Sequence, residues 1–360
     1  MKYEYWFAGI RNIPDRTKIK LKEKAGTAEA IYYIEETALR KMQLLKEQEI
    51  WKLLEAKKKE ELDRNYEAMR QKGISVIPWG EKEYPGRLKE IYDPPYALYV
   101  KGKLPDNTAR AAAIVGARSC TPYGEKYALE YGKKLAECGI QVISGLARGV
   151  DGIGQRGALL GGGKTFAVLG SGVDVCYPKN HMGLYLDILE QEGGILSELP
   201  PGTPPLPQHF PRRNRIISAL SDIVLVMEAR ERSGSLITAD LALDYGREVY
   251  AVPGNVTSAL SYGTNALIKQ GCPIITEGSD ILSALGIAYK ETEKVKFQIK
   301  TAENISPEEK EIFDLIEDST PISAEALCRR LGRKVQEVQY ILSLLELSGY
   351  IEKIPQAGYI

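Results

Sequence analysis

The sequence predicts an α/β protein with an extended Rossmann-like fold, built on a doubly wound, mainly parallel sheet. Two observations between residues 110 and 288 lead to this fold class. Short, continuously apolar runs recur there, and helical patterns such as Tyr123–Cys138 and Leu236–Tyr245 separate them. Apolar strands that alternate with helices are typical of a parallel sheet covered on both faces. The expected strands are Ala112–Val115, Gln141–Ser144, Thr165–Leu169, Gly194–Ser197, Ile223–Met227, Glu248–Val252 and Pro273–Thr276.

The segments on either side of this region have a different character. Residues 1–75 are strongly charged and carry apolar residues at helical spacing, which predicts a helical N-terminal domain. The stretch GISVIPW predicts a short strand, and the Pro-punctuated YPGRLKEIYDPPYALYVKG is expected to pack against the next domain. We therefore place the Rossmann-like domain at residues 76–288.

The C-terminal part of the chain predicts a linker and a third domain. Residues 289–304 are polar and form the expected linker. Residues 305–360 predict three helices and a hairpin, the pattern of a small winged-helix-like domain. The helices are expected from a Ser306 cap to Ile316, at Ser323–Leu331 and at Val335–Leu347, with the hairpin in GYIEKIPQAGYI.

Composition excludes several classes of protein. The chain has 48 basic and 48 acidic residues, so its net charge gives no indication of a nucleic-acid partner. Five cysteines without a CxxC pair fit free thiols in a reducing cytosol, and two histidines argue against a metal site. The N-terminus lacks the apolar run of a signal peptide, and no run reaches the length of a membrane span. We expect a cytoplasmic protein.

The loops after the predicted strands share one chemistry. In a doubly wound sheet, ligands bind outside the carboxyl ends of the strands. Nearly every loop there offers glycines, hydroxyl groups or a cation, which is a combination that suits a ligand with several phosphates. The cations are Arg118, Arg148, Lys179, Arg212, Arg213 and Arg215.

Three arginines crowd the start of one predicted helix, in HFPRRNRIISALSDIVLVMEA. A helix N-terminus carries partial positive charge, so cations are disfavoured there unless an anion is close. One interpretation is that Arg212, Arg213 and Arg215 bind a negatively charged ligand. The other is that Arg212 pairs with Glu198 or Glu228 and holds the loop. Phe210 beside them is equally consistent with base stacking and with core packing.

No set of residues indicates catalysis or a cofactor. GGGKT at residues 161–165 resembles the end of a P-loop, but it precedes a strand, whereas a P-loop follows one. Gly170 and Gly172 begin a dinucleotide fingerprint, yet Val175 stands where its third glycine belongs. Glu198 and Glu228 follow two different strands but have no catalytic partner at a defined spacing, and Asp151 suits a cap or turn as well as a catalytic role. We expect no cofactor, no metal and no catalytic residue.

Six stretches, in order, resemble the DNA-processing protein A (DprA/Smf) family. They are AIVGARSCTPYG, VISGLARGVDGIGQRGAL, FAVLGSGVDVCYPKNH, GGILSELPPGTPP, FPRRNRIISALSDIVLVMEARERSGSLITADLALDYGREVYAVPGN and GTNALIKQGC. The resemblance spans about residues 75–285. It implies a protein that binds single-stranded DNA, helps load the recombinase RecA, and protects incoming DNA during natural transformation. It implies no enzyme. It also implies a homodimer through the Rossmann-like domain, near Asn265–Gln270, and an N-terminal domain of sterile-alpha-motif or helix-hairpin-helix type.

The resemblance also assigns residues to a DNA pocket. Arg118 matches the family's G-[SAT]-R motif, and Lys179 matches the basic residue after Tyr-Pro. The S-G motif after the second strand is Ser144 and Gly145. The F-P-x-R-N-R motif gives Arg212, Arg213, Asn214 and Arg215. We add Phe210 as a stacking residue, since single-strand binding combines a cationic groove with planar groups.

Two further readings remain beside this one. The first is a nucleotide-processing enzyme of the phosphoribohydrolase type, whose P-G-G-x-G-T-x-x-E motif corresponds here to ERSGSLITAD, without the paired glycines or the glutamate. The second concerns residues 305–360, which hold six basic and ten acidic residues and a net charge of −4. That charge disfavours DNA, so we expect this domain to contact protein.

Overall fold

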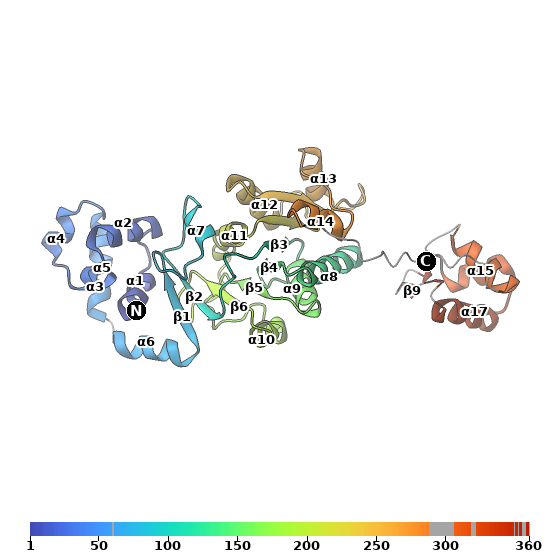
Figure 1. Cartoon of the computed structure of the whole chain (residues 1–360), viewed down its shortest axis with the longest axis horizontal. Coiled ribbons are helices and arrows are strands. Elements are labelled where there is room, and N and C mark those ends of the chain that lie inside the picture. Colours follow the sequence, from blue (N-terminus) through green and yellow to red (C-terminus); the bar gives the residue numbers. More distant parts are fainter. Residues whose placement is uncertain are drawn as a thin grey trace. The chain divides into compact units, whose positions relative to one another are not determined.

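The computed structural model describes residues 1–59, 61–287, 306–317, 322–348, 350–351, 353–354 and 358–359. The chain forms two compact units, Met1–Tyr289 and Lys290–Ile360 (Figure 1). The linker expected at residues 289–304 lies outside the described residues, and the domain boundaries remain predictions. Among the residues described, no helix combines the length and apolarity needed to cross a membrane.

An eight-stranded sheet forms the centre of the larger unit and confirms the predicted fold class. Its order is β1-β2-β6-β5-β4-β3-β7-β8. The six strands from β6 to β8 pair in parallel, whereas β2 runs antiparallel to β6 and β1 antiparallel to β2. The strands are β1 (Ile74–Pro78), β2 (Ala97–Gly102), β3 (Ala111–Val115), β4 (Gln141–Ser144), β5 (Thr165–Val168), β6 (Gly194–Ser197), β7 (Ile223–Val226) and β8 (Glu248–Ala251).

Two segments differ from the expectation. The strand predicted at Pro273–Thr276 is a single bridge between Ile274 and Ala251, because proline has no N–H to donate to a longer ladder. The Pro-punctuated segment after β1 does more than pack against the sheet, since its run ALYVKG is strand β2. That run follows two prolines and is short, so its apolar residues gave no clear period.

Helices cover both faces of the sheet, as a doubly wound fold requires. On one face, Ile114 and Val142 pack against α8 (Pro122–Glu137), α9 (Val150–Leu160) and α14 (Gly278–Ala284). On the other, Val115 and Val224 pack against α7 (Gly86–Lys89), α11 (His209–Leu220) and α12 (Gly234–Asp244). The remaining elements of this region are the 3-10 turn η1 (Lys179–His181), α10 (Met182–Glu190) and α13 (Tyr262–Lys269).

The N-terminal region is helical, as predicted, and packs on the antiparallel edge of the sheet. Its core contains Trp6, Phe7 and Leu21, continuous with Tyr96 and Tyr99 of the β2 segment. The Tyr96 hydroxyl donates a hydrogen bond to buried Glu4, which also pairs with Lys22 at 2.8 Å. The helices are α1 (Lys2–Gly9), α2 (Asp15–Ala25), α3 (Ala28–Tyr33), α4 (Glu36–Lys41), α5 (Glu47–Lys59) and α6 (Leu62–Gln71).

The smaller unit has the predicted three helices and a hairpin. They are α15 (Pro307–Glu317), α16 (Ala324–Leu331), α17 (Val335–Leu347), β9 (Lys353–Ile354) and β10 (Gly358–Tyr359). Ser306 accepts a hydrogen bond from the Glu309 N–H and Ser323 accepts one from the Ala326 N–H, as N-caps do. Ile312, Leu327 and Leu342 form a core of its own.

Glycines allow α8 and α9 to approach closely. A Cβ at Gly132 would overlap the carbonyl oxygen of Gly154, and one at Gly157 would overlap that of Leu129. These obstacles are backbone atoms, which cannot rotate away as side chains do. The close approach fixes α9, whose first turn forms part of the site described below.

We predict that Gly157→Ala lowers the free energy of unfolding by about 2 kcal/mol or more, because overpacking against backbone forces the two helices apart. Urea denaturation measures the change. The matched control is Gly183→Ala in α10, where a Cβ meets nothing within 4 Å. That variant should be neutral or more stable by up to about 1 kcal/mol. Equal effects of the two substitutions would contradict the packing argument.

Candidate nucleic-acid interface

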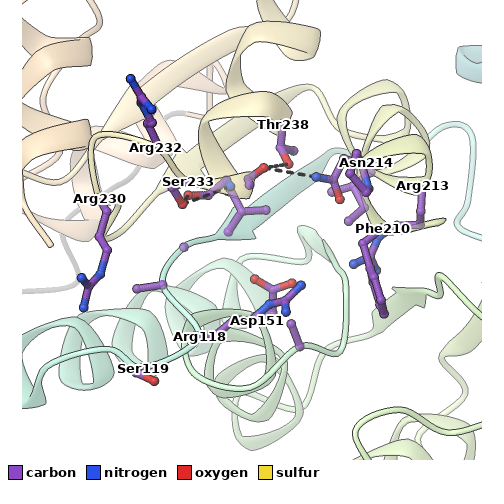
Figure 2. A pocket seen from close by; sticks show the side chains of 18 of the residues that line it. Arg118, Ser119, Asp151, Phe210, Arg213, Asn214, Arg230, Arg232, Ser233 and Thr238 are labelled. Atoms are coloured by element: carbon purple, nitrogen blue, oxygen red, sulfur yellow. Dashed lines mark hydrogen bonds between the residues drawn. The ribbon is translucent and has the colours of Figure 1, made fainter. Parts of the chain in front are cut away.

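A pocket of about 570 Å³ opens at the carboxyl ends of β3 and β7 (Figure 2). These neighbouring strands are the point at which the chain order of the sheet reverses. Ligands of open α/β sheets bind at such a point. The pocket is lined by Val115, Gly116, Ala117, Arg118, Ser119, Ala147, Asp151, Tyr177, Pro205, Pro207, Phe210, Pro211, Arg213, Asn214, Ile217, Arg230, Arg232, Ser233, Gly234, Ser235, Thr238 and Leu260.

The loop after β3 is held by close backbone contacts. The Val150 N–H donates to the Ala117 carbonyl at 3.2 Å, and Gly149 adopts a φ of 70° where any side chain would meet that carbonyl. A Cβ at Gly116 would meet the Val150 side chain. Glycine is needed at both positions for this approach. The loop therefore presents Arg118 from a fixed backbone.

Glu228, which had no evident partner in the sequence, holds the start of α8. Its buried carboxylate accepts hydrogen bonds from the Thr121 N–H at 2.9 Å and from the Thr121 hydroxyl. The same hydroxyl accepts a hydrogen bond from the Gly124 N–H at 3.2 Å and caps the helix. A carboxylate near a helix N-terminus is also favoured by the helix dipole. This contact fixes the far end of the Arg118 loop.

Three planar groups form what we call the Phe210 platform: Arg118, Phe210 and Tyr177. The Arg118 guanidinium lies 5.4 Å from the centre of the Phe210 ring, and the Tyr177 ring lies 5.7 Å from it at a tilt of 42°. Phe210 is half-buried and rests close to Gly170, while Tyr177 is 45% exposed. Phe210 therefore packs against the protein and also lines the pocket, and its role in base stacking stays a prediction.

Arg213 lines the pocket from a buried position. Its Nη1 donates to the carbonyl oxygens of Gly145, at 2.9 Å, and of Val168. Burial lowers the pKa of Arg213 to about 10, although the nearby Asp151 carboxylate opposes this shift. Burial likewise raises the pKa of Asp151, against the charge of Arg213 and the Gly145 N–H. The Gly145 backbone joins the two groups, since its carbonyl accepts from Arg213 of α11 and its N–H donates to Asp151 of α9.

The structure corrects the expectation that Arg215 is open to a ligand, and it pairs Arg212 with carboxylates while leaving that side chain half exposed. The Arg215 side chain is 6% exposed, and its Nη2 lies 2.6 Å from Glu198 Oε2. Arg212 is half exposed and pairs with Glu198 at 3.0 Å and Asp15 at 2.8 Å. Neither residue lines the pocket. Pairing of Arg212 with Glu198, the second interpretation of the arginine cluster, is what the structure contains.

The remaining predicted residues divide between the pocket and its surroundings. Asn214 lines the pocket and donates to the Gly234 carbonyl at 3.2 Å. Ser144 does not line it, because its buried hydroxyl donates to the Ile114 carbonyl at 2.6 Å. Gly145 is buried between Arg213 and Asp151. Lys179 is exposed in η1, two residues beyond Tyr177, and is outside the lining.

Sequence reasoning missed several lining residues, among them Tyr177, Arg230, Arg232 and Ser233. Arg230 and Arg232 are exposed, and neither forms a salt bridge within the part of the chain that the structure describes. Both lie in the loop EARERSGSLITAD after β7. Ligands bind at the carboxyl ends of the strands, so the position of this loop predicts a site there, but it does not indicate which of its residues line the pocket. Tyr177 directly precedes Pro178 and Lys179. Its ring contact with Phe210 marks it as part of the site, and this contact is not evident in the sequence.

The charge of the lining is strongly positive. Four arginines (Arg118, Arg213, Arg230 and Arg232) stand against one carboxylate, that of Asp151. No group of three or more His, Cys, Asp or Glu side chains suited to a metal ion occurs among the described residues. Guanidinium groups bind phosphate through paired hydrogen bonds, and aromatic rings stack on bases. The pocket can therefore bind a phosphate backbone together with a base.

Fold and pocket together define a Rossmann-like α/β protein with a cationic, aromatic-lined site at the reversal of its sheet. The chain belongs to the DNA recombination-mediator protein A family, whose model matches residues 75–286. A model of the DprA winged helix domain matches residues 300–356, which confirms the predicted winged-helix-like domain.

Relatives in sequence cover most of the chain. Protein Smf of Escherichia coli is 39% identical over 296 residues, which are 81% of this chain and 78% of that protein. The DNA processing protein DprA of Streptococcus pneumoniae is 44% identical over 200 residues, 56% of this chain and 70% of that protein.

Two solved structures are similar over the larger unit. The X-ray structure of DNA processing protein A from Streptococcus pneumoniae has a TM-score of 0.68 and 32% identity, covering 79% of this chain and 97% of that chain. DNA processing protein A from Helicobacter pylori has a TM-score of 0.53 and 31% identity, covering 59% of this chain and 95% of that chain. The latter is described as having a unique single-stranded DNA binding mode.

We predict that Glu198 stabilises the fold mainly through Arg215. In a double-mutant cycle, Glu198→Leu and Arg215→Met should show a coupling energy of about 2 kcal/mol or more, because each single change leaves a buried charge without its partner. The cycle of Glu198→Leu with Arg212→Met should give less than about 1 kcal/mol, since Arg212 is half exposed. Urea denaturation of the variants measures both values, and equal couplings would refute the distinction.

Proposed function

We propose that this chain is a single-stranded DNA-binding recombination mediator, which protects incoming DNA and helps load RecA recombinase during natural transformation. The observation that carries the proposal is the pocket at the reversal of the sheet, which four arginines line together with Phe210 and Tyr177. Family membership and the single-stranded DNA binding described for the Helicobacter pylori protein support it.

The binding mode follows from the groups present. Arg118, Arg230 and Arg232 stand at the pocket and bind phosphates, which are common to every nucleotide. Phe210 and Tyr177 stack with bases through their ring faces, and every base offers such a face. The expected affinity is therefore sensitive to salt and tolerant of sequence. Asn214 is the lining amide best suited to hydrogen-bond a base edge or sugar.

We further propose that the protein acts as a binding protein and not as an enzyme. Asp151 is the one lining carboxylate, and its hydrogen bond with the Gly145 N–H and the nearby charge of Arg213 give it a structural use. The ERSGSLITAD segment supplies Ser233 as the cap of α12. Turnover of a mononucleotide by the purified protein would instead favour the phosphoribohydrolase reading.

The partners and location complete the proposal. A homodimer forms around α13, where Val256, Tyr262 and Ile274 are large apolar side chains left 46–77% exposed. Exposed apolar groups close together on a monomer mark interaction surfaces. The acidic C-terminal unit contacts protein, and the chain acts in the cytoplasm.

The first test is the binding of fluorescein-labelled dT20 to the full chain across a salt series. Arg118→Ala should weaken binding about tenfold and flatten the salt dependence by about 0.7 in log–log slope, since one phosphate contact is lost. Phe210→Ala should weaken binding by a similar factor with an unchanged slope, because a stacking contact carries no charge.

The control for loss of charge is Arg64→Gln on α6, whose side chain is 78% exposed and pairs with Glu61, three residues before it. It should bind dT20 like the wild type. Arg215→Ala should lose stability while a folded fraction still binds. Binding by Arg118→Ala and Phe210→Ala with wild-type affinity and slope would place the DNA outside this pocket.

A separate prediction concerns the dimer. Tyr262→Arg with Ile274→Arg should convert the dimer to a monomer, since two cations in an apolar interface are costly to desolvate. Light scattering coupled to size-exclusion chromatography measures the mass. Lys20→Glu, an exposed change on α2, is the control and should leave the mass unchanged. A wild-type chain that is monomeric at every concentration tested would contradict the proposal.

A further inference from the structure

An ion-pair cluster joins the first turn of α2 to α11. We call it the α2–α11 cluster, and its members are Asp15, Asp93, Glu198, Arg212 and Arg215. Asp15 Oδ2 lies 2.8 Å from Arg212 Nη2 and 3.8 Å from Arg215 Nη2. Arg215 also lies 3.5 Å from Asp93 through its Nε. The N-terminal helices therefore reach α11, the helix that carries Phe210 and Arg213 of the pocket.

In this cluster, two of the carboxylates are buried and one of the arginines is half exposed. The carboxylates of Asp15 and Glu198 are 12% and 5% exposed, whereas Arg212 is 50% exposed. Two more arginines, Arg11 and Arg16, are exposed on the N-terminal side, and Arg11 donates to the Thr203 hydroxyl at 3.0 Å. Asp93 is the one carboxylate of the cluster with a substantially exposed side chain, and it is paired with Arg215. Among these residues, the exposed charges are three arginines (Arg11, Arg16 and Arg212) against the one carboxylate of Asp93.

An aromatic ring stands at the outer edge of this surface. Tyr92 is 77% exposed, and the Arg16 guanidinium lies 4.0 Å from its ring centre. Arginine stacked on one face orients the ring and leaves its opposite face for another planar group. Because most of the Tyr92 side chain is exposed, its burial adds little to the stability of the fold.

Helix α11 connects the pocket with the segment that carries Tyr92. Pro211 and Arg213 line the pocket, and Arg212 stands between them in the same turn of α11. Arg212 contacts Asp15, the neighbour of Arg16, and Arg215 contacts Asp93, the neighbour of Tyr92. A ligand that extends from the pocket to Tyr92 can leave the buried carboxylates of Asp15 and Glu198 paired with their arginines.

We propose that single-stranded DNA extends from the pocket across Arg212 to a second stacking site, where a base packs on Tyr92 and Arg16 contacts a backbone phosphate. This inference rests on the proposed function and adds a site on the N-terminal side of the chain. It makes the N-terminal helices part of the DNA surface. A strand too short to leave the pocket gains nothing from this site.

The experiment compares competition by dT6 and dT20 for binding to the full chain. Tyr92→Ala should lower the affinity for dT20 about tenfold and leave that for dT6 unchanged, in the range of one lost base stack. Arg16→Gln should lower dT20 affinity about threefold and flatten its salt dependence. Tyr92→Phe, which keeps the ring, should bind both oligonucleotides like the wild type.

The controls separate this site from the pocket. Trp51→Ala removes another exposed aromatic, on α5, and Arg64→Gln removes another exposed charge, so both should leave the affinity unchanged. Tyr92→Ala with wild-type affinity for dT20, or with equal losses for dT6 and dT20, overturns the second site. If Phe210→Ala weakens both oligonucleotides in the same assay, the pocket remains the binding site and only this inference fails. If Phe210→Ala also has no effect, the proposed function of the pocket fails with it.

Discussion

The reversal of strand order between β3 and β7 is the constraint on which the site depends. The helix after β3, α8, packs on one face of the sheet, and the helix after β7, α12, packs on the other. Because the two connections leave in opposite directions, no backbone fills the space between the strand ends. Arg118 enters that space from one loop, and Arg230 and Arg232 from the other. The topology of the sheet therefore creates the space, and the arginines of the two loops give it positive charge.

The arginines around α11 divide into those that hold the fold and those that remain open. Arg215 and Arg213 are buried and bind Glu198 and backbone carbonyls respectively, so they fix the helix that carries Phe210 and Asn214. Arg118, Arg230 and Arg232 stand at the pocket, where a phosphate can replace water around them. A buried pair costs desolvation energy, and what it provides here is a fixed orientation of α11. Arg118, Arg230 and Arg232 therefore lie beside a helix whose position is fixed.

Much of this architecture follows from local patterns in the sequence. The bounds of β4, β6 and α17 were predicted to the residue, because apolar runs of fixed period leave little choice of conformation. The strand-end rule located the edge of the sheet that holds the pocket. It did not show which arginines are ion-paired within the fold and which are open to a ligand. Asp15 is 197 residues from Arg212, and no local pattern in the sequence pairs them. Strand β2 and the Tyr177 ring were missed for the same reason, since each is defined by a partner distant in the chain.

The separate cores of the two units affect how unfolding of this chain is observed. All three tryptophans, at positions 6, 51 and 79, belong to the larger unit, and the smaller unit contains tyrosines and phenylalanines but no tryptophan. Tryptophan emission therefore follows the melting of the larger unit alone, whereas circular dichroism records helix loss from both. Two probes that disagree on this protein would reveal loss of cooperativity between its units rather than an intermediate within either.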